Sequence, residues 1–589
     1  MGGIDKGGSC DRLALLLRQT MNLSKQDRSP SAGTQVSVRK ERVGQARVFG
    51  KKRGWALAFA VSFAGALAAC QGCKGTNMPK PTDSPVAETP TLRLYLVSDL
   101  AGALEPCGCV KDQLGGLDHA AAFIRSESAR SPNSALVASG PLFFMDPTLR
   151  EERRAQEIAK AETLSAALKG LGLVAFTPGR NDWAAGQDEL LGLGKASGGS
   201  ILLSNVATPS KDAWVGSMVR ELGGVKVGFI GVAVLDADGL PTGPVASPPA
   251  EAIKREVDSC KQQGAQIVIA LASVGRGEAK RIADIAPSLT AILVGSSWQG
   301  GDVNSDTPSA ERVGDVLIAQ TGNHLQTLAT LDLFVRDGDF KFKDASGLDQ
   351  AKKREDLVKR IDDLRGKIAT WEKEGKVQRA DIDARKADLQ KLEDEKKTLD
   401  TPPAPTKGSF LRYSVTEVRD GLGKDDAVGK GLLAYYKNVN DANKAAFAGK
   451  LPPKPGADEP FYAGIDACSE CHKSERKFWD KTAHHNAYAT LSTQFKEFNL
   501  DCVSCHVTGY DKVGGSTVAH VEKLESVQCE VCHGPSGKHA SKPAVAVPVP
   551  RPGSDMCASC HHPPHVHTFD SAAKMAEIIG PGHGMPGTP

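Results

Sequence analysis

Four Cys-x-x-Cys-His pentapeptides in the last quarter of the chain constrain its structure more than any other feature. This spacing is the attachment site of c-type haem, in which two thiols add to the porphyrin and the histidine ligates iron. Zinc ribbons do not place a histidine after the second cysteine every time, and disulfides have no use for histidine. The sequence therefore predicts four c-type haems. Their tethers are Cys468, Cys471, Cys502, Cys505, Cys529, Cys532, Cys557 and Cys560, and their proximal ligands are His472, His506, His533 and His561.

Further histidines cluster around these motifs. Twelve of the 14 histidines lie between His472 and His583, and four of them belong to the motifs. An iron held by one histidine takes a second axial ligand or stays open for a small molecule. The candidates for a second ligand are His484, His485, His520, His539, His565, His567 and His583. We favour His484, in an expected helix after the first motif, and His539, in a Gly/Pro loop after the third.

The region from Cys468 to the C-terminus resembles the tetrahaem cytochrome c family typified by the nitrifier protein that accepts electrons from hydroxylamine oxidoreductase. The matching residues are Cys-Ser-Glu-Cys-His followed by Trp479 and Thr-Ala-His484, Cys-Val-Ser-Cys-His-Val-Thr-Gly, Cys-Glu-Val-Cys-His-Gly-Pro-Ser-Gly-Lys-His539 and Cys-Ala-Ser-Cys-His. The resemblance covers roughly a fifth of the chain. It implies stacked haems, mostly with histidine on both faces, and electron transfer to a redox partner protein that the sequence does not identify.

The N-terminal region predicts export. Lys51-Lys-Arg53 precedes an apolar run from Trp55 to Ala69, which is short for a membrane span and typical of a signal-peptide core. The run ends in Leu-Ala-Ala-Cys70, which is typical of bacterial lipoprotein processing, with cleavage before Cys70 and lipidation of its thiol. A plain signal peptide or an anchor helix is the alternative, and the long leader suggests a start at Met21. We expect residues 1–70 to be this signal, residues 71–90 to be a flexible tether, and the mature protein to be a periplasmic or outer-membrane lipoprotein of the bacterial cell envelope.

Residues 91–345 alternate short apolar runs with helical segments, which predicts an α/β sandwich. Five short motifs follow apolar runs of this region, namely Ser98-Asp-Leu-Ala-Gly102, Ser139-Gly-Pro141, Gly179-Arg-Asn-Asp-Trp-Ala-Ala-Gly186, Ala270-Leu-Ala-Ser-Val-Gly275 and Val294-Gly-Ser-Ser-Trp298. Their order resembles the calcineurin-like metallophosphatases of the 5'-nucleotidase type, in which metal ligands follow the strands. That resemblance implies a four-layer sandwich. Asp99 is the one ligand retained; the other ligand positions hold Ala101, Pro141, Arg180, Asn181, Ser273, Ser296 and Trp298. Because two-metal hydrolysis needs several histidines and carboxylates around the cations, we do not expect phosphohydrolase activity.

Two cysteines, Cys107 and Cys109, follow the first strand of this region. Cysteines separated by one residue bind a soft metal, form a strained disulfide or react with a sulfur substrate. They are therefore candidate redox thiols. An ordinary disulfide with Cys260 or Cys73 is an equally open interpretation.

The remaining segments connect the two halves. Apolar residues at spacings of three and four, interrupted at Gly375, predict an antiparallel helical hairpin or coiled coil over residues 350–400, with a surface for dimerisation. A small α/β connector is expected over residues 406–450 and a mainly α haem domain over residues 455–589.

The net charge of +3 does not favour nucleic acid as a partner. The expected function is electron transfer by a lipid-anchored cytochrome fused to a non-hydrolytic 5'-nucleotidase-like domain. Two alternatives stay open: a metal-dependent phosphoesterase with a cytochrome appendage, and a haem oxidoreductase acting on a small nitrogen or sulfur compound at a five-coordinate iron.

Overall fold

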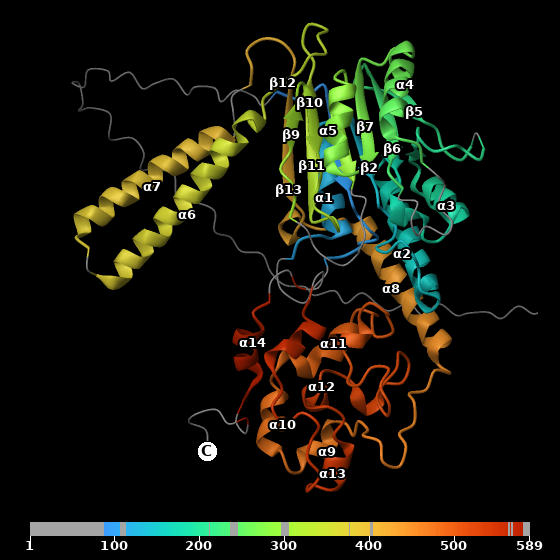
Figure 1. Ribbon diagram of the computed structural model, residues 1–589, viewed down its shortest axis with the longest axis vertical. Helices are drawn as coiled ribbons and strands as arrows, with labels where there is room; N and C mark the ends of the chain where they lie inside the picture. The colour runs from blue at the N-terminus through green and yellow to red at the C-terminus, as the bar shows by residue number, and fades with distance from the viewer. Residues whose placement is uncertain are drawn as a thin grey trace, which may run out of the picture. The chain divides into compact units, whose positions relative to one another are not determined.

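A computed structural model describes residues 88–106, 113–210, 212–235, 246–295, 306–375, 377–400, 404–562, 566, 569–580 and 583 (Figure 1). The expected signal sequence with Cys70, the thiols Cys107 and Cys109, and His565 and His567 lie outside these residues. None of the helices within the described ranges is both long enough and apolar enough to cross a bilayer.

The first sheet contains seven strands in the described residues. From one edge to the other the order is β12 (Lys343–Asp344), β13 (Phe410–Glu417), β11 (Thr327–Phe334), β1 (Leu92–Ser98), β2 (Ser134–Ser139), β3 (Leu173–Thr177) and β4 (Ser200–Ile201). Strands β1 to β4 are parallel, whereas β11 runs antiparallel to both β1 and β13. The apolar-run pattern did not predict β11, because Asp332 interrupts its apolar run. The strand accommodates Asp332 because its carboxylate forms an ion pair with Arg93 on β1, at 2.6 Å.

The second sheet contains six strands in the described residues. Their order is β5 (Ser217–Leu222), β6 (Val225–Ala233), β7 (Ile267–Ser273), β8 (Ala291–Gly295), β10 (Val316–Ala319) and β9 (Glu311–Val313). The central strands β6, β7, β8 and β10 are parallel and largely apolar, as expected of strands covered on both faces.

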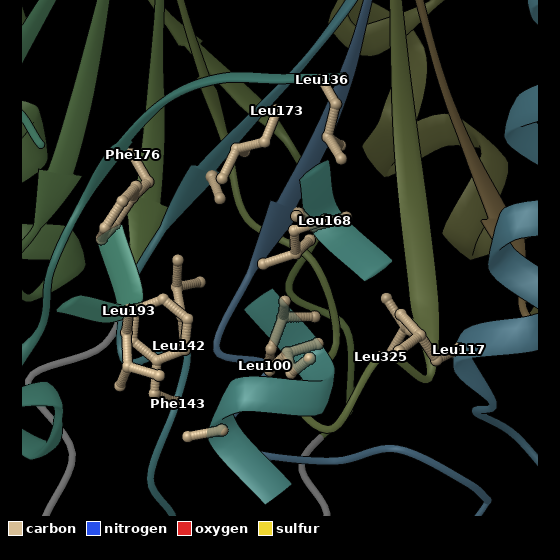
Figure 2. Packing of buried hydrophobic residues seen from close by; sticks show 14 of the residues in the cluster. Leu100, Leu117, Leu136, Leu142, Phe143, Leu168, Leu173, Phe176, Leu193 and Leu325 are labelled. Carbon is tan, nitrogen blue, oxygen red and sulfur yellow. The ribbon is translucent and has the colours of Figure 1, made fainter. Parts of the chain in front are cut away.

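Three apolar cores separate the layers. The first lies between the first sheet and the helices α1 (Leu117–Arg130), α2 (Glu151–Gly170), α3 (Gln187–Ser197) and α8 (Asp426–Phe447), and Figure 2 shows part of it around Leu100, Phe143 and Phe176. The second fills the space between the two sheets. The third lies between the second sheet and the helices α4 (Pro249–Gln262) and α5 (Arg276–Ile285). The predicted four-layer α/β sandwich is therefore confirmed.

The predicted helical hairpin is also present (Figure 1). It consists of α6 (Ala351–Glu374) and α7 (Arg379–Asp400). Gly375 ends α6 in the left-handed conformation, with φ of 64°, which glycine adopts without the steric cost of a Cβ. Ion pairs such as Arg365–Glu393, at 2.6 Å, link the two helices across a narrow apolar seam.

The segment expected as a connector, residues 406–450, is built into the sandwich. All eight residues of β13 pair with β11, and α8 contributes Val428, Leu432 and Tyr435 to the first core. Asp425 caps α8 by accepting a hydrogen bond from the backbone N–H of Val428 at 2.9 Å.

The haem region consists of short helices and irregular segments. Its helices are α9 (Ile465–Ser469), α10 (Lys473–Trp479), α11 (Ala487–Ser492), α12 (Cys529–His533), α13 (Gly537–Ser541) and α14 (Ser571–Ile578). Within the described residues its apolar core cluster consists of five buried side chains, namely Leu500, Val503, Val507, Val518 and Val521. A region of this size with so small a core needs another source of stability.

Candidate haem centre

Each Cys-x-x-Cys-His motif folds into about one helical turn. In the first motif the backbone N–H of His472 donates to the carbonyl of Cys468 at 3.0 Å, and in the fourth the N–H of His561 donates to Cys557 at 2.8 Å. The third motif forms helix α12, and the second contains a short 3₁₀ helix, Val503–Cys505. A turn of this kind brings two thiols and the following imidazole to one side of the backbone, as thioether attachment and axial ligation require.

Three of the four motif histidines face a second histidine at nearly the same distance. The ring centroids of His472 and His539 are 6.4 Å apart, and those of His561 and His484 are 6.3 Å apart. His533 faces His583, with centroids 6.4 Å apart. Each pair joins a motif to a histidine that is distant in sequence.

This separation fits a metal ion between the two rings. Metal–imidazole bonds are about 2 Å long, and the bonded nitrogen lies about 1.2 Å from its ring centre, so two opposed ligands place their centroids about 6.4 Å apart. Direct stacking of imidazoles would bring the rings much closer. The residues present therefore fit haem iron with histidine on both faces.

Hydrogen bonds on the opposite ring nitrogen orient several of these imidazoles. The Nδ1 atom of His533 lies 2.9 Å from the carbonyl of Val549, and that of His539 lies 2.7 Å from the carbonyl of Val545. An Nδ1–H donated to a carbonyl leaves Nε2 as the metal ligand. The exposed segment Val545–Val549 thus orients ligands of two different motifs.

The electrostatic surroundings of His484 suit the same role. Burial lowers the pKa of His484, and the neighbouring His561 lowers it further. A lowered pKa keeps the imidazole neutral, which is the form that binds a metal.

The attachment sites are close to one another. The thiol of Cys529, in the third motif, raises the pKa of Cys468 in the first, and the thiol of Cys505, in the second, raises the pKa of Cys560 in the fourth. These cysteines would therefore tether haems at neighbouring sites.

His506, of the second motif, differs from the other three proximal candidates. Its Nδ1 lies 2.5 Å from the carbonyl of Ala487, so the ring is oriented for ligation. Within the ranges described we find no histidine ring facing it, and His565 and His567 fall outside those ranges.

Two other candidate ligands have different surroundings. The Nε2 atom of His520 lies 2.7 Å from the carbonyl of Ala448, and the ring of His485 packs edge-on against Trp479. The structure brings neither to a proximal histidine. His484 lies in a short 3₁₀ helix, Ala483–Asn486, rather than in the longer helix expected from the sequence.

The phosphatase-like positions lie at the carboxyl ends of the strands. Asp99 accepts a hydrogen bond from Gln320 at 3.3 Å, and the hydroxyl of Ser273 donates to the carbonyl of Gly140 at 3.2 Å. Arg180 and Asn181 are buried in a 3₁₀ helix after β3. Across the described ranges, no three His, Cys, Asp or Glu side chains gather as ligands of a single metal ion; Ser296 and Trp298 are not among those residues.

Asp182, next to these positions, has a structural role that the motif analysis missed. Its carboxylate accepts hydrogen bonds from the backbone N–H groups of Leu142, Phe143 and Gly179, at 2.7 to 3.0 Å. Burial raises the pKa of Asp182 to about 6, against the opposing effect of these backbone donors. The side chain therefore fixes two loops at the end of the first sheet.

The sequence analysis also missed a cluster of buried amides, Gln156, Asn440, Asn443 and Asn499, that joins α2 and α8 to the haem region. Asn440 and Asn443 lie three residues apart and therefore on one face of α8. This spacing is the feature of the sequence that could have indicated a polar contact on that face of α8.

The structure thus joins a four-layer α/β sandwich to a region whose paired histidines fit c-type haem. Residues 467–534 match the family model described as "Cytochrome c554 and c-prime". Cytochrome c-554 of Nitrosomonas europaea is 32% identical over 139 residues, an alignment that covers 18% of this chain and 59% of the relative. The chain thus spans about three fifths of that relative's length. The resemblance of the C-terminal region to this cytochrome family is confirmed, and the family implies c-type haem.

Solved structures of phosphoesterases are among those similar to the chain. A 5'-nucleotidase precursor from Thermus thermophilus superposes with a TM-score of 0.38 and 16% identity, over 59% of this chain and 59% of that one. The calcineurin-like phosphoesterase YfkN from Bacillus subtilis superposes with a TM-score of 0.35 and 20% identity, over 42% of this chain and 86% of that one.

Proposed function

We propose that the mature protein is an electron-transfer protein of the bacterial cell envelope that carries four c-type haems, one at each motif. The observation that carries this proposal is the separation of 6.3 to 6.4 Å in three histidine pairs. Haem supplies an iron that changes oxidation state by one electron. Three histidine pairs would hold haem iron from both faces, which would limit rearrangement on a change of oxidation state.

Several contacts support transfer between the sites. The thiol of Cys529 perturbs the pKa of Cys468, and the thiol of Cys505 perturbs the pKa of Cys560, which indicates neighbouring attachment sites. The histidine pairs also connect motifs, because His539 follows the third motif and faces His472 of the first. Haems held at these motifs would therefore lie at neighbouring sites, as electron transfer between them requires.

A second candidate function is reaction with a small nitrogen or sulfur compound. It is favoured by His506, which lacks a facing histidine among the residues that the structure describes. An iron with one protein ligand has a free position for a substrate, whereas an iron with two histidines does not.

Cys107 and Cys109 remain candidate redox thiols, outside the described residues. Glu105, two residues earlier, forms an ion pair with Lys496 and accepts a hydrogen bond from Tyr436 at 3.0 Å. Lys496 precedes the second motif by six residues. The structure shows Cys260, one alternative disulfide partner, as a free and buried thiol.

The other features of the expected location and assembly stay part of the proposal. These are lipidation of Cys70, membrane attachment through that lipid, a separate redox partner protein, and a dimer formed through the α6–α7 hairpin. Phosphoester hydrolysis is the less favoured alternative, because among the predicted ligand positions Asp99 alone carries a carboxylate.

The test is a haem and metal count on the full chain, produced in cells that attach c-type haem. We expect about four haems and four irons per chain, three haems with low-spin and one with high-spin spectra, and reversible one-electron reduction. Fewer haems would contradict the proposal. Additional manganese or zinc, together with phosphoesterase activity, would favour the hydrolase alternative.

A further inference from the structure

The residues directly before the second motif are held by two helices of the α/β sandwich. Among the described residues, the hydrogen bonds and ion pairs that we find between α2 or α8 and the haem region all reach residues 497–501. Cys502 follows immediately. The described contacts of α2 and α8 thus lie next to the second haem site.

A buried amide network makes the central contact. The side-chain oxygen of Gln156 accepts hydrogen bonds from the backbone N–H of Leu500 at 2.9 Å and from Asn443 Nδ2 at 2.8 Å. Its Nε2 donates to the side chain of Asn499 at 3.3 Å. Asn443 also donates to the carbonyl of Phe498 at 2.9 Å. Gln156 and Asn499 are each only 2% exposed, so water cannot replace a hydrogen-bond partner that is lost. The network therefore favours one arrangement of these side chains.

Asn499 connects the buried amide network to the second motif. Its backbone carbonyl accepts from the N–H groups of Cys502 at 3.1 Å and Val503 at 2.9 Å. Val503 is fully buried in the small apolar core of the haem region. The turn that carries Cys502, Cys505 and His506 therefore begins at a residue that Gln156 fixes.

Charged side chains reinforce the same contact. Asp501 forms ion pairs with Arg153 and with Lys160, the latter at 2.9 Å, and Glu157 pairs with Lys160 at 3.0 Å. All three α2 residues lie within two turns of Gln156. Helix α2 thus presents one continuous polar face to the segment.

We propose that α2 and α8 position the second haem site, with Gln156 and Asn443 as positioning residues. This inference rests on the proposed function, because it requires a haem attached through Cys502 and Cys505. In this arrangement the α/β sandwich is a structural support that sets the position of one haem site. That haem is the one whose proximal His506 has no facing histidine among the described residues.

The test compares two network variants with a matched control in the haem-loaded full chain. Gln156→Met keeps the volume of the side chain and removes its hydrogen bonds, and Asn443→Ala removes two contacts from α8 while leaving Gln156 bonded to Leu500. The control is Asn205→Ala, a buried amide of the sandwich that bonds Ala233 and Ser247. The readouts are the high-spin and low-spin electron paramagnetic resonance signals, the midpoint potential of each component, and the affinity for cyanide.

We expect both network variants to shift the high-spin signal and its potential and to weaken cyanide binding by roughly fivefold, the effect of losing about one net hydrogen bond. The low-spin signals should stay unchanged, and Asn205→Ala should leave all signals unchanged. If the loaded variants match the wild type, or if every haem changes alike, the positioning role is wrong although the cytochrome function stands. A wild-type protein without haem at the second motif would overturn both. If the Gln156→Met variant cannot be produced in its haem-loaded form, the result for Asn443→Ala tests the proposal.

Discussion

The imidazole rings of His472 and His539 face each other with their centroids 6.4 Å apart, although they belong to different motif neighbourhoods. The pairing crosses from the first motif to the loop after the third. If both rings bind one iron, as we propose, a ligand from one motif neighbourhood would complete the site of another, and these haem sites would fold together.

Removal of His539 should convert one low-spin haem into a high-spin haem. In His539→Ala the iron bound by His472 loses its second protein ligand, so the high-spin signal should rise by about one haem per chain. Electron paramagnetic resonance of the oxidised protein measures this change. His520→Ala is the control, because His520 Nε2 bonds a backbone carbonyl, and it should leave the spectrum unchanged. An unchanged spectrum in His539→Ala would rule out this pairing.

The wild-type protein should bind about one cyanide per chain in its oxidised state. His506 is the one motif histidine without a facing histidine in the described part of the chain, so we expect the iron that it would hold to have a free position, whereas irons with two histidines exchange ligands slowly. Optical titration gives the stoichiometry. Complete absence of binding would mean that a group outside the described residues fills this position.

Loss of the Asp182 carboxylate should destabilise the sandwich strongly. Asp182→Ala leaves three buried backbone N–H groups without their acceptor, and we expect a loss on the order of 2–4 kcal/mol in the free energy of unfolding. Denaturant unfolding followed by tryptophan fluorescence measures it. Asp188→Ala, in the first turn of α3, is the control and should change stability by less than about 0.5 kcal/mol. Equal effects of the two substitutions would contradict the anchoring role.

The contribution of Glu157 to stability should disappear in acid. Burial alone would raise the pKa of Glu157, but Lys160 and Arg153 outweigh it and hold this pKa below its ordinary value of 4.5. A carboxylate with a lowered folded-state pKa stabilises the protein above its unfolded-state pKa, and this stabilisation is lost as the pH falls through the folded-state value. Glu157→Gln should therefore be less stable than the wild type at pH 7, by on the order of 1–3 kcal/mol. The difference should shrink below about pH 4.5.

Thermal unfolding of both proteins across this pH range tests the prediction. Glu162→Gln is the control, because Glu162 lies exposed on the same helix and should show no such pH dependence. A difference that is constant from pH 7 to pH 3 would contradict the assignment.

Without haem, residues 455–589 should not fold, whereas the sandwich should. The five-residue apolar core found in the haem region is too small to offset the loss of chain entropy, and the histidine pairs need iron between them. Limited proteolysis of protein made without haem attachment should degrade this region and leave a stable fragment containing residues 91–450. A protease-resistant haem region in such protein would show that the cofactors are not its core.

The sequence alone determined what local spacing and local composition encode. The Cys-x-x-Cys-His spacing predicts the attachment sites, because thioether attachment and axial ligation require neighbouring residues within about one turn. The alternation of apolar runs with helical segments predicted the α/β sandwich, since strands buried on both faces, such as β7 and β8, are continuously apolar. The break at Gly375 located the turn of the hairpin for a similarly local reason, the left-handed conformation that glycine adopts.

The tertiary structure decided which distant residues meet. No spacing rule connects His484 to His561 or His533 to His583, because those pairs form only when separate segments fold around a common centre. The strand β11 depends in the same way on Arg93 of β1, which neutralises Asp332. The contact of Gln156 with Asn499 joins two regions far apart in the chain, and buried hydrogen bonds of this kind depend on three-dimensional complementarity that a linear pattern does not carry.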